Sequence, residues 1–527
     1  MNFFPRPAKR QNSAPPPQPP SRSVPPHVPE AWESPRPQPA ATIATLIGLI
    51  LTAFAVSSGG PARPPSEMAS AAAIGTGASL LLGFAFEVRK GLNNLIRADV
   101  LALLAFYFLT LFEFLFPQVN FDSMAAHDSA SAAVYVVLIA FAGMLLGRHL
   151  LHPKRQPFQK VLTHEIPAGI LLFIFWFSFC IGYLHQWSSP AVNWDPVKWM
   201  DYSLAARFEQ PWGRGRFGNF SALLYELNML INLVPPLTGI ILARRQRFGV
   251  IALLLVVLAY LLTLFLAFAG GTRNVLATYL VTFVIGFAFA APKGRRKELL
   301  IMSGMAVAVL VFGTVTMPRI RTVGLKKVLS GEVAFAQAKS ETMYVDYNLF
   351  NISKLTEVFP SRMPYLGLEV PYLALIRPIP RAFWPGKPEG LSNTIEKALG
   401  YFGGNITISA SFAGEAYMSG GLFAVLLASI FFGALNGWWS HLMAPKNSEL
   451  GILIYSSGFF AAVISMRSLF TYTTALLPTV AAIVGTSYLV RYLVKKARSL
   501  ASHSKARVIQ TRPGARPVAP RKPSSDE

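Results

Sequence analysis

A cluster of positive charges lies in a proline-rich segment that reads Arg-Pro-Ile-Pro-Arg-Ala-Phe-Trp-Pro-Gly-Lys-Pro from residue 377. Proline fixes φ and interrupts helices, so the segment is predicted to form a stiff turn that holds Arg377, Arg381 and Lys387 at set positions. A guanidinium group suits phosphate because it offers two parallel hydrogen bonds, and an ammonium group adds a point charge. The pattern predicts a phosphate-binding turn, with a connector whose cations meet lipid headgroups as the alternative.

A second cationic motif, Gly270-Gly271-Thr272-Arg273, separates two apolar segments. Glycine lets an anion approach the backbone closely, and the amides and dipole at the start of the next helix favour negative charge. We expect Arg273 to face the same side of the membrane as the proline-rich turn. The alternative is an arginine that reaches for the membrane interface, where its cost is far below the roughly 2.5–3.5 kcal/mol of the bilayer centre.

Glu415 stands at the start of an apolar segment, in the run Gly-Glu-Ala-Tyr-Met-Ser-Gly-Gly that begins at residue 414. A carboxylate at such a boundary can accept a proton from a sugar hydroxyl or bind sugar hydroxyls. The alternative is a carboxylate that a helix dipole stabilises. Glu113 and Glu226 lie within apolar segments, where carboxylates serve function or hydrogen bonds between helices. The sequence has neither a paired-histidine zinc motif nor a nucleotide-binding phosphate loop, so we do not expect ATP to supply energy through this chain. No metal and no cofactor are expected.

The composition places these residues in a membrane protein. The chain has 527 residues, of which 53% are hydrophobic and only 14% charged, and its mean hydropathy is +0.42. Soluble domains carry about 25% charged residues, so a soluble enzyme, a disordered protein and a coiled coil are excluded. The net charge of +23 suits a basic membrane protein and is no evidence for nucleic-acid binding. The single cysteine, Cys180, excludes an intramolecular disulfide.

About twelve segments are apolar and long enough to cross a bilayer as helices, which takes roughly 20 residues. The predicted spans are residues 41–58, 68–86, 99–116, 132–151, 166–184, 220–242, 248–268, 274–291, 299–318, 417–438, 449–466 and 470–493. Alternate short loops are basic, among them 87–98, which contains Arg97, and 243–247. Basic loops are the cytoplasmic ones, so both termini are predicted to be cytoplasmic and residues 319–416 to lie outside.

The sequence thus predicts an all-α polytopic membrane protein with about 12 transmembrane helices and one long extracytoplasmic loop that contains short helices. Residues 1–40 are predicted to be a disordered Pro-rich cytoplasmic tail, and residues 494–527 a basic cytoplasmic tail near anionic headgroups. Spans one to nine occupy residues 41–318, and the last three occupy residues 417–493. Inside the large periplasmic loop 319–416, residues 334–358 show the amphipathic pattern of a helix that lies on the membrane.

The proline-rich turn and the Gly-Glu-x-Tyr-x-x-Gly-Gly motif together resemble the oligosaccharide repeat unit polymerase family. This family comprises the O-antigen and exopolysaccharide polymerases of the bacterial inner membrane. The Gly-Gly-Thr-Arg motif is similar to that family too. The resemblance covers residues 41–493, its specific part being 269–277 and 377–421, and the two tails are not part of it.

The resemblance implies a metal-independent membrane glycosyltransferase that joins polyprenyl-pyrophosphate-linked oligosaccharides at the periplasmic face. The growing chain would leave its lipid pyrophosphate and be attacked by a sugar hydroxyl of the next lipid-linked unit. Preset cations stabilise the charge that develops on a departing pyrophosphate. The expected catalytic residues are Glu415, Arg273 and Arg381; the expected pyrophosphate ligands are Arg273, Arg377, Arg381 and Lys387; and the residues expected to stack on sugars are Trp384 and Tyr417.

Two other functions fit the sequence. An O-antigen ligase-like glycosyltransferase would use the same chemistry with a different acceptor, and a transporter of lipid-linked oligosaccharides or polysaccharides belongs to another class. A transporter is expected to place its charges in a cavity near the bilayer midplane, whereas the cations here gather at the outer boundary. The expected partners are polyprenyl-pyrophosphate-linked oligosaccharides, membrane lipids, and a chain-length regulator and a flippase of the same pathway, with no nucleic acid.

Overall fold

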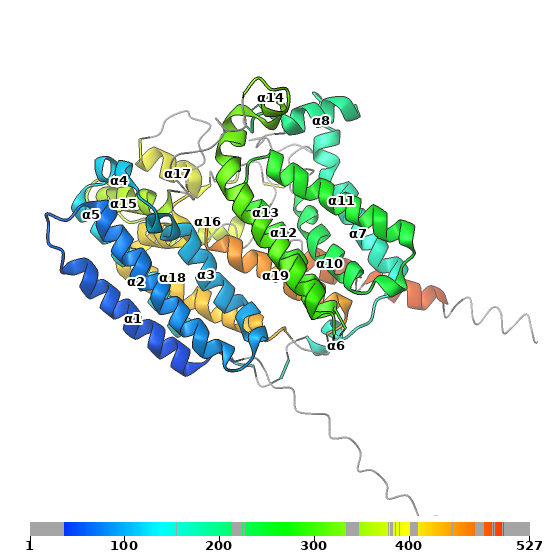
Figure 1. Ribbon diagram of the computed structural model, residues 1–527, viewed down its shortest axis with the longest axis horizontal. Coiled ribbons are helices and arrows are strands. Elements are labelled where there is room, and N and C mark those ends of the chain that lie inside the picture. Colours follow the sequence, from blue (N-terminus) through cyan, green and yellow to red (C-terminus); the bar gives the residue numbers. More distant parts are fainter. Residues whose placement is uncertain are drawn as a thin grey trace, which may run out of the picture. The chain divides into compact units, whose positions relative to one another are not determined.

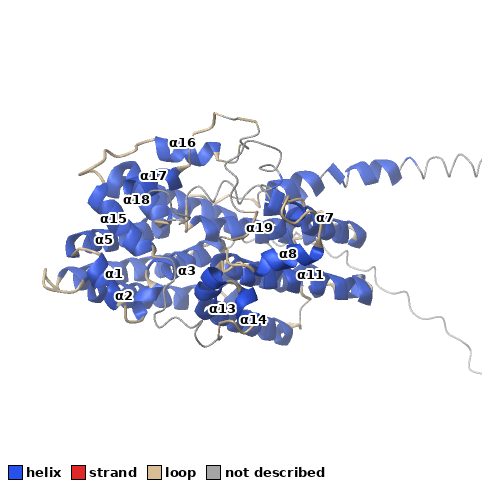
Figure 2. Ribbon diagram, turned by 90° about the horizontal axis from the view of Figure 1, so that it is seen from above, coloured by secondary structure: helices blue, strands red, loops and turns tan. Residues whose placement is uncertain are grey.

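The computed structural model describes residues 36–499 with internal gaps (Figure 1). The gaps are residues 154, 157, 208, 213–223, 225–226, 293, 334–346, 378, 380–382, 385, 389, 401–408, 444–446, 469–478, 487, 490 and 498. Within the described residues the regular elements are all helices, with no strand (Figure 2). The all-α class predicted from the sequence is therefore confirmed for this part of the chain, while most of both predicted tails lies outside it.

Eight helices in the described residues are long and apolar enough to cross a membrane. They are α1 (Pro39–Ser57), α2 (Pro65–Val88), α5 (His127–Gly147), α7 (Ala168–Trp187), α11 (Val250–Ala269), α12 (Arg273–Ala290), α13 (Arg296–Val323) and α18 (Ser411–Ser440). Three shorter helical segments match further predicted spans: α3 (Ala98–Thr110), η3 with α10 (Asn228–Leu233, Val234–Ala243) and α19 (Glu449–Ser465). Since much of residues 470–493 lies outside the described part, the count of twelve stays a prediction.

The other helices are short connectors. They are η1 (Leu92–Ile96), η2 (Phe112–Leu115), α4 (Val119–Met124), α6 (Gln159–Leu162), α8 (Pro196–Leu204), η4 (Arg245–Arg247), α14 (Leu325–Leu329), α15 (Asn348–Val358), α16 (Glu369–Ile376) and α17 (Leu391–Ala398). The last four lie between α13 and α18, which is the segment where the sequence predicts a long loop with short helices. The side of the membrane on which they lie stays a prediction.

Small residues bring α5 and α18 into close contact. Gly147 faces the backbone of Ile430, and Gly433 faces the backbone of Met144, so closely in both places that a Cβ atom would clash with a carbonyl oxygen. Each glycine has a second glycine four residues away in its own helix, which is the small-xxx-small pattern of packed membrane helices. The two helices therefore form a closely packed pair. Helix α5 also contacts α1 and α2, and α18 also contacts α3.

Helix α15 lies inside the protein and not on the membrane. Its apolar residues Leu349, Ile352 and Leu355 are buried in the same core cluster as residues of α5 and α18. The prediction of a membrane-surface helix is therefore wrong for α15, because its apolar face contacts protein. Residues 334–346, the first half of the predicted helix, lie outside the described residues.

A kink divides α18 into two parts. Gly420 and Gly421 depart from helical geometry, and Gly421 has a φ of 66°, which favours glycine. The hydroxyl of Tyr365 occupies the place where a side chain at Gly421 would begin. The part before the kink, Ser411–Ser419, is largely buried, and it positions Glu415.

Candidate functional site

The proline-rich turn is closed by its own lysine. The Nζ atom of Lys387 donates hydrogen bonds to the carbonyl oxygens of Arg377 and Ile379, each at 2.8 Å. The guanidinium of Arg377 lies beside Gly390, whose Cβ position is 3.7 Å from Nη1. The turn thus holds two of the three predicted cations near one another, with Lys387 also acting as a clamp on the backbone. The third, Arg381, lies outside the described residues.

Arg273 is the first residue of α12, and two further arginines meet the chain at this point. Nη1 of Arg207 donates a hydrogen bond of 3.2 Å to Oγ1 of Thr272, and the amide of Arg207 donates one of 3.1 Å to the carbonyl of Arg321. The Cα atom of Arg321 would lie 2.8 Å from a Cβ atom on Gly271. Only glycine permits this contact, so the Gly-Gly pair brings together three arginine-bearing segments. Arg207 and Arg321 lie far from Arg273 in the chain, and no sequence pattern associates them with it.

Glu415 is buried in the first part of α18 and accepts a hydrogen bond of 2.6 Å from the hydroxyl of Ser468. The segment that carries Ser468 runs alongside the start of α18. The amide of Phe412 donates to the carbonyl of Met466 at 3.4 Å, and the hydroxyl of Ser409 donates to the carbonyl of Arg467 at 3.0 Å. A carboxylate oriented in this way has one oxygen bonded to a serine, which is a geometry that suits a proton acceptor.

Tyr417 and Glu415 point to different faces of α18, since residues two apart on a helix do not face each other. The hydroxyl of Tyr417 donates to the carbonyl of Phe359 at 3.3 Å, and its ring meets that of Tyr365 edge-on at a centroid distance of 6.1 Å. Trp384 is half-buried against the core, and its carbonyl accepts a hydrogen bond from the Lys387 amide. Tyr417 therefore contributes to packing, and stacking of either ring on a sugar stays a prediction.

The predicted site residues are anchored in two different parts of the core. Apolar residues on either side of the proline-rich turn, Ile376 and Leu391, belong to the same buried cluster as Phe412 and Ala416, the neighbours of Glu415. Ala269 and Leu276, which flank Arg273, belong to two other clusters, formed mainly with α11 and α13. The structure thus associates the turn with the Glu415 helix through a common core and supports Arg273 separately.

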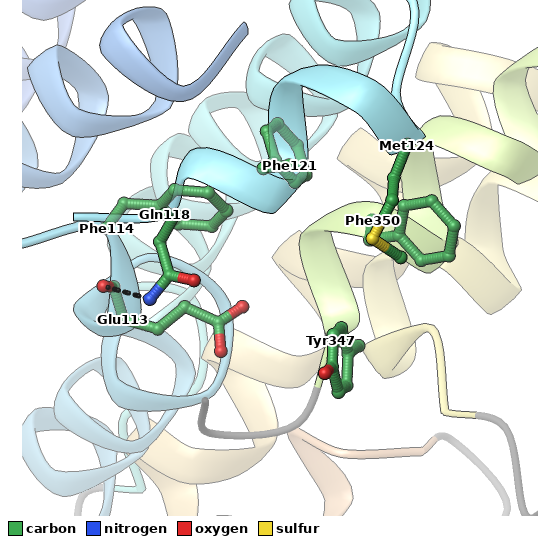
Figure 3. A pocket seen from close by; sticks show the side chains of 7 residues that line it. All are labelled: Glu113, Phe114, Gln118, Phe121, Met124, Tyr347 and Phe350. Carbon is green, nitrogen blue, oxygen red and sulfur yellow. Dashed lines mark hydrogen bonds between the residues drawn. The ribbon is translucent and has the colours of Figure 1, made fainter. Parts of the chain in front are cut away.

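Glu113, a carboxylate that the sequence placed within an apolar segment, lines a small cavity (Figure 3). The cavity has a volume of about 10 Å³, which is room for a single water molecule. Aromatic side chains form much of its wall, among them Phe114, Phe121 and Phe350. Such a cavity can hydrate the carboxylate but is too small for a sugar. The second carboxylate of this kind, Glu226, lies outside the described residues.

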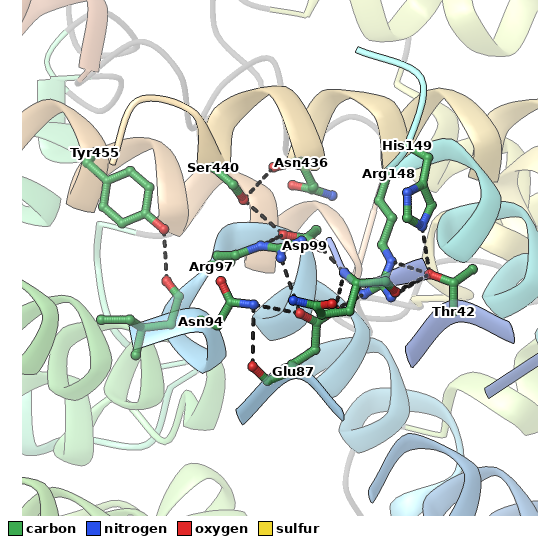
Figure 4. Close-up of polar contacts among 12 residues, drawn as sticks. Thr42, Glu87, Asn94, Arg97, Asp99, Arg148, His149, Asn436, Ser440 and Tyr455 are labelled. Carbon is green, nitrogen blue, oxygen red and sulfur yellow. Dashed lines mark hydrogen bonds and ion pairs between the residues drawn. The ribbon is translucent and has the colours of Figure 1, made fainter. Parts of the chain in front are cut away.

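A buried network of four charges was not recognised in the sequence (Figure 4). Arg97 has an exposed fraction of 0%. Its guanidinium binds both oxygens of Asp99, one of them through a 2.9 Å bond from Nε, and lies 3.3 Å from Glu87. Nη1 of Arg148 lies 3.2 Å from Glu87 and 3.6 Å from Asp99. Two positive and two negative charges therefore compensate one another inside the bundle.

Hydroxyl groups from two more helices complete this network. Thr42 of α1 accepts a 2.6 Å hydrogen bond from Arg148, and Ser440 of α18 donates one of 2.9 Å to Asp99. Arg97, which belongs to a loop predicted to be basic and cytoplasmic, is thus an internal residue. The sequence feature that could have indicated this network is the presence of both acidic and basic residues, such as Glu87 and Arg148, at the ends of apolar segments.

Three histidines lie beside the network. The ring of His152 lies 6.4 Å from that of His149 and 5.4 Å from that of His441. Burial and the charge of Arg148 hold the pKa of His149 at about 4, and burial lowers the pKa of His441 to about 4. Both rings are therefore uncharged at neutral pH. Across the described residues, no group of three or more His, Cys, Asp or Glu side chains is arranged to hold a metal ion.

No known family model matches this sequence, and no curated protein or solved structure matches it either. The fold and the composition define the class: a helical protein embedded in a membrane through several apolar helices.

Proposed function

We propose that the protein is a membrane glycosyltransferase that polymerises polyprenyl-pyrophosphate-linked oligosaccharide repeat units into O-antigen or exopolysaccharide. The observation that carries this proposal is the meeting of three arginine-bearing segments at the start of α12. Arg273 opens the helix, the Arg207 guanidinium is bonded to Thr272, and the backbone of Arg321 touches Gly271. Arginine side chains brought to one point in this way would stabilise an anion whose charge grows during the reaction, as it does on a departing pyrophosphate.

In the proposed reaction the bond between the anomeric carbon of the growing chain and its pyrophosphate oxygen breaks. A hydroxyl of the incoming lipid-linked unit forms the new glycosidic bond and loses its proton to Glu415. The hydrogen bond from Ser468 keeps the Glu415 carboxylate oriented for this step. Arg273, Arg377, Arg381 and Lys387 are the proposed ligands of the leaving pyrophosphate. Because Arg273 and the proline-rich turn rest on separate core clusters, the lipid-linked substrate must reach both. The proposed reaction needs neither a metal nor a cofactor.

The proposal includes a location. The protein would lie in the bacterial inner membrane with both termini in the cytoplasm, and the reaction would take place at the periplasmic face. Its substrates would be delivered by a flippase, and a chain-length regulator would set the product size. The predicted orientation supports this arrangement, because the basic short loops and the proline-rich turn fall on opposite sides.

The glycan profile of a strain that lacks the gene tests the proposal, with complementation by Arg273→Ala, Arg381→Ala and the control Arg89→Ala. We expect the first two variants to yield only single repeat units at a normal protein level in the membrane, and the control to restore the full ladder of chain lengths. Ladders of wild-type length in both arginine variants would contradict the proposed clamp. Accumulation of lipid-linked units on the cytoplasmic side in the deletion strain would indicate a transporter, and full-length chains left on polyprenyl pyrophosphate would indicate a ligase.

A further inference from the structure

Helix α16 is apolar on both of its faces. Its sequence is Glu-Val-Pro-Tyr-Leu-Ala-Leu-Ile, with one charged residue at its start. Val370, Leu373 and Ala374 are buried in the core cluster that contains the start of α18. A helix that is hydrophobic all round is normally enclosed by protein or by lipid. Here only one face is enclosed by described residues.

The opposite face of α16 is exposed. Leu368, at its N-terminal end, has an exposed fraction of 83% and Leu375 one of 72%, and Tyr372 between them is exposed as well. Residues 368, 372 and 375 follow the spacing of one helical stripe. Beyond the helix, Ile379 and Phe383 in the turn are 40% and 75% exposed. Contiguous apolar surface of this kind marks a site of contact with a membrane or a partner.

The backbone places the start of α16 beside the kink of α18. The amide of Leu366 donates to the carbonyl of Met418 at 2.8 Å, and the amide of Gly367 donates to that of Ser419 at 2.9 Å. Directly after the kink, α18 exposes Phe423 and other large apolar residues in the manner of a lipid-facing helix. The exposed stripe of α16 therefore begins at the level where the lipid-facing surface of α18 begins.

Helix α15 provides the contrast, because the part of it that is not buried is polar. Lys354 and Glu357 form an ion pair there at 3.1 Å, and together with Arg362 they line an open cleft of about 310 Å³. This surface suits water. The exposed surface of α16 is apolar, and it is followed by a turn that carries the cations Arg377 and Lys387.

We propose that the exposed face of α16 lies in the lipid bilayer, with the described residues Arg377 and Lys387 after the helix at the level of the lipid headgroups. Acyl chains would cover Leu368, Tyr372 and Leu375, and the phosphates of the lipid headgroups would face Arg377 and Lys387. The charges favour this occupant, since anionic phosphates lie at the depth where the apolar stripe ends and the cations begin. If the proposed function also holds, this position in the bilayer places Arg377 and Lys387 at the depth of the pyrophosphate of a lipid-linked substrate.

Spin labels on the full-length chain test this proposal. In a Cys180→Ser background, a nitroxide is attached to Leu368→Cys or Leu375→Cys, and the protein is reconstituted into phospholipid vesicles without polyprenyl lipid. Collision with oxygen and with a water-soluble nickel chelate is measured for each label. The references are Phe423→Cys, on the lipid-facing part of α18, and Lys354→Cys, in the polar cleft. All four positions are wholly or partly exposed, so the labels leave the core intact, and size-exclusion chromatography verifies folding.

We expect the labels at 368 and 375 to resemble the label at 423, with a ratio of oxygen to nickel collisions several-fold above that at 354. A ratio equal to that at 354 would overturn the proposal. A ratio that rises only after polyprenyl diphosphate is added would overturn it too, because the face would then bind the tail of a lipid substrate. The vesicles contain no glycan, so this result is independent of whether the protein polymerises sugars.

Discussion

Replacement of Arg97 by methionine removes one of the two cations from the buried network. Glu87 and Asp99 would then share Arg148 alone, from which they lie 3.2 Å and 3.6 Å away. The loss is not repaired by water, since the site of Arg97 is fully buried. Removing one partner of a buried ion pair costs about 3–5 kcal/mol, because it leaves an uncompensated charge in a medium of low polarity. We expect Arg97→Met to lower the free energy of unfolding by about this amount, a large share of the roughly 5–15 kcal/mol of a typical domain.

Unfolding by a denaturing detergent, titrated into mixed micelles and followed by circular dichroism, measures this loss. The matched control is Arg89→Met, because Arg89 is exposed and its guanidinium rests on the ring of Phe86; its effect should stay near 0.5 kcal/mol. The double variant Arg97→Met/Asp99→Leu leaves one carboxylate with one arginine, so we expect it to be more stable than Arg97→Met alone.

Two results would refute the reasoning about the network. The first is an Arg97→Met variant that is no less stable than the Arg89→Met control. The second is a double variant whose loss of unfolding free energy equals the sum of the losses of Arg97→Met and Asp99→Leu measured singly. Residues in one network are expected to couple by about 0.5–3 kcal/mol, so the two losses should not add.

Two further predictions concern the same end of the bundle. Gly147→Leu should prevent the close contact of α5 with Ile430 and abolish accumulation of folded protein in the membrane. The control Gly169→Leu, at a position with open space around it, should be tolerated. Comparable membrane levels of the two variants would contradict this prediction. Because the pKa of His441 is about 4 when folded and its ordinary value is 6.5, the unfolded state binds more protons between these values, and stability should fall as the pH drops from 6.5. His441→Gln should weaken this fall in melting curves, and the exposed control His164→Gln should not.

The sequence predicts the helices well and their ends less well, for a physical reason. Hydropathy records which residues suit lipid, and so it places the tenth span at residues 417–438. The helix itself begins at Ser411, because its first part is enclosed by protein and needs no lipid-like composition. Conversely, the third span is predicted to end at residue 116, but α3 ends at Thr110 and the chain then continues as the short helix η2. Tertiary contacts, which a hydropathy window does not contain, decide both ends.

The same limit applies to charges. Positions of arginine and lysine along the chain predict orientation, but they do not report burial, so Arg97 and the exposed Arg89 look alike in the sequence. The proline-rich turn is the opposite case. Its prolines restrict the backbone locally, and local restriction is what a sequence pattern can predict. That Lys387 would bond the carbonyl of Arg377 could not be predicted, because it depends on how the turn closes.

The buried network and the candidate site are connected through α18. Ser440, in the last turn of α18, is bonded to Asp99, and Glu415 lies near the other end of the same helix. If α18 were one rigid rod, any change in the network would rotate or shift Glu415. Gly420 and Gly421 depart from helical geometry between the two parts of α18. The part before the kink is held separately, because the carbonyls of Met418 and Ser419 accept hydrogen bonds from Leu366 and Gly367. The position of Glu415 therefore depends on the kink and on its neighbours α15 and α16 more than on the charges at the far end.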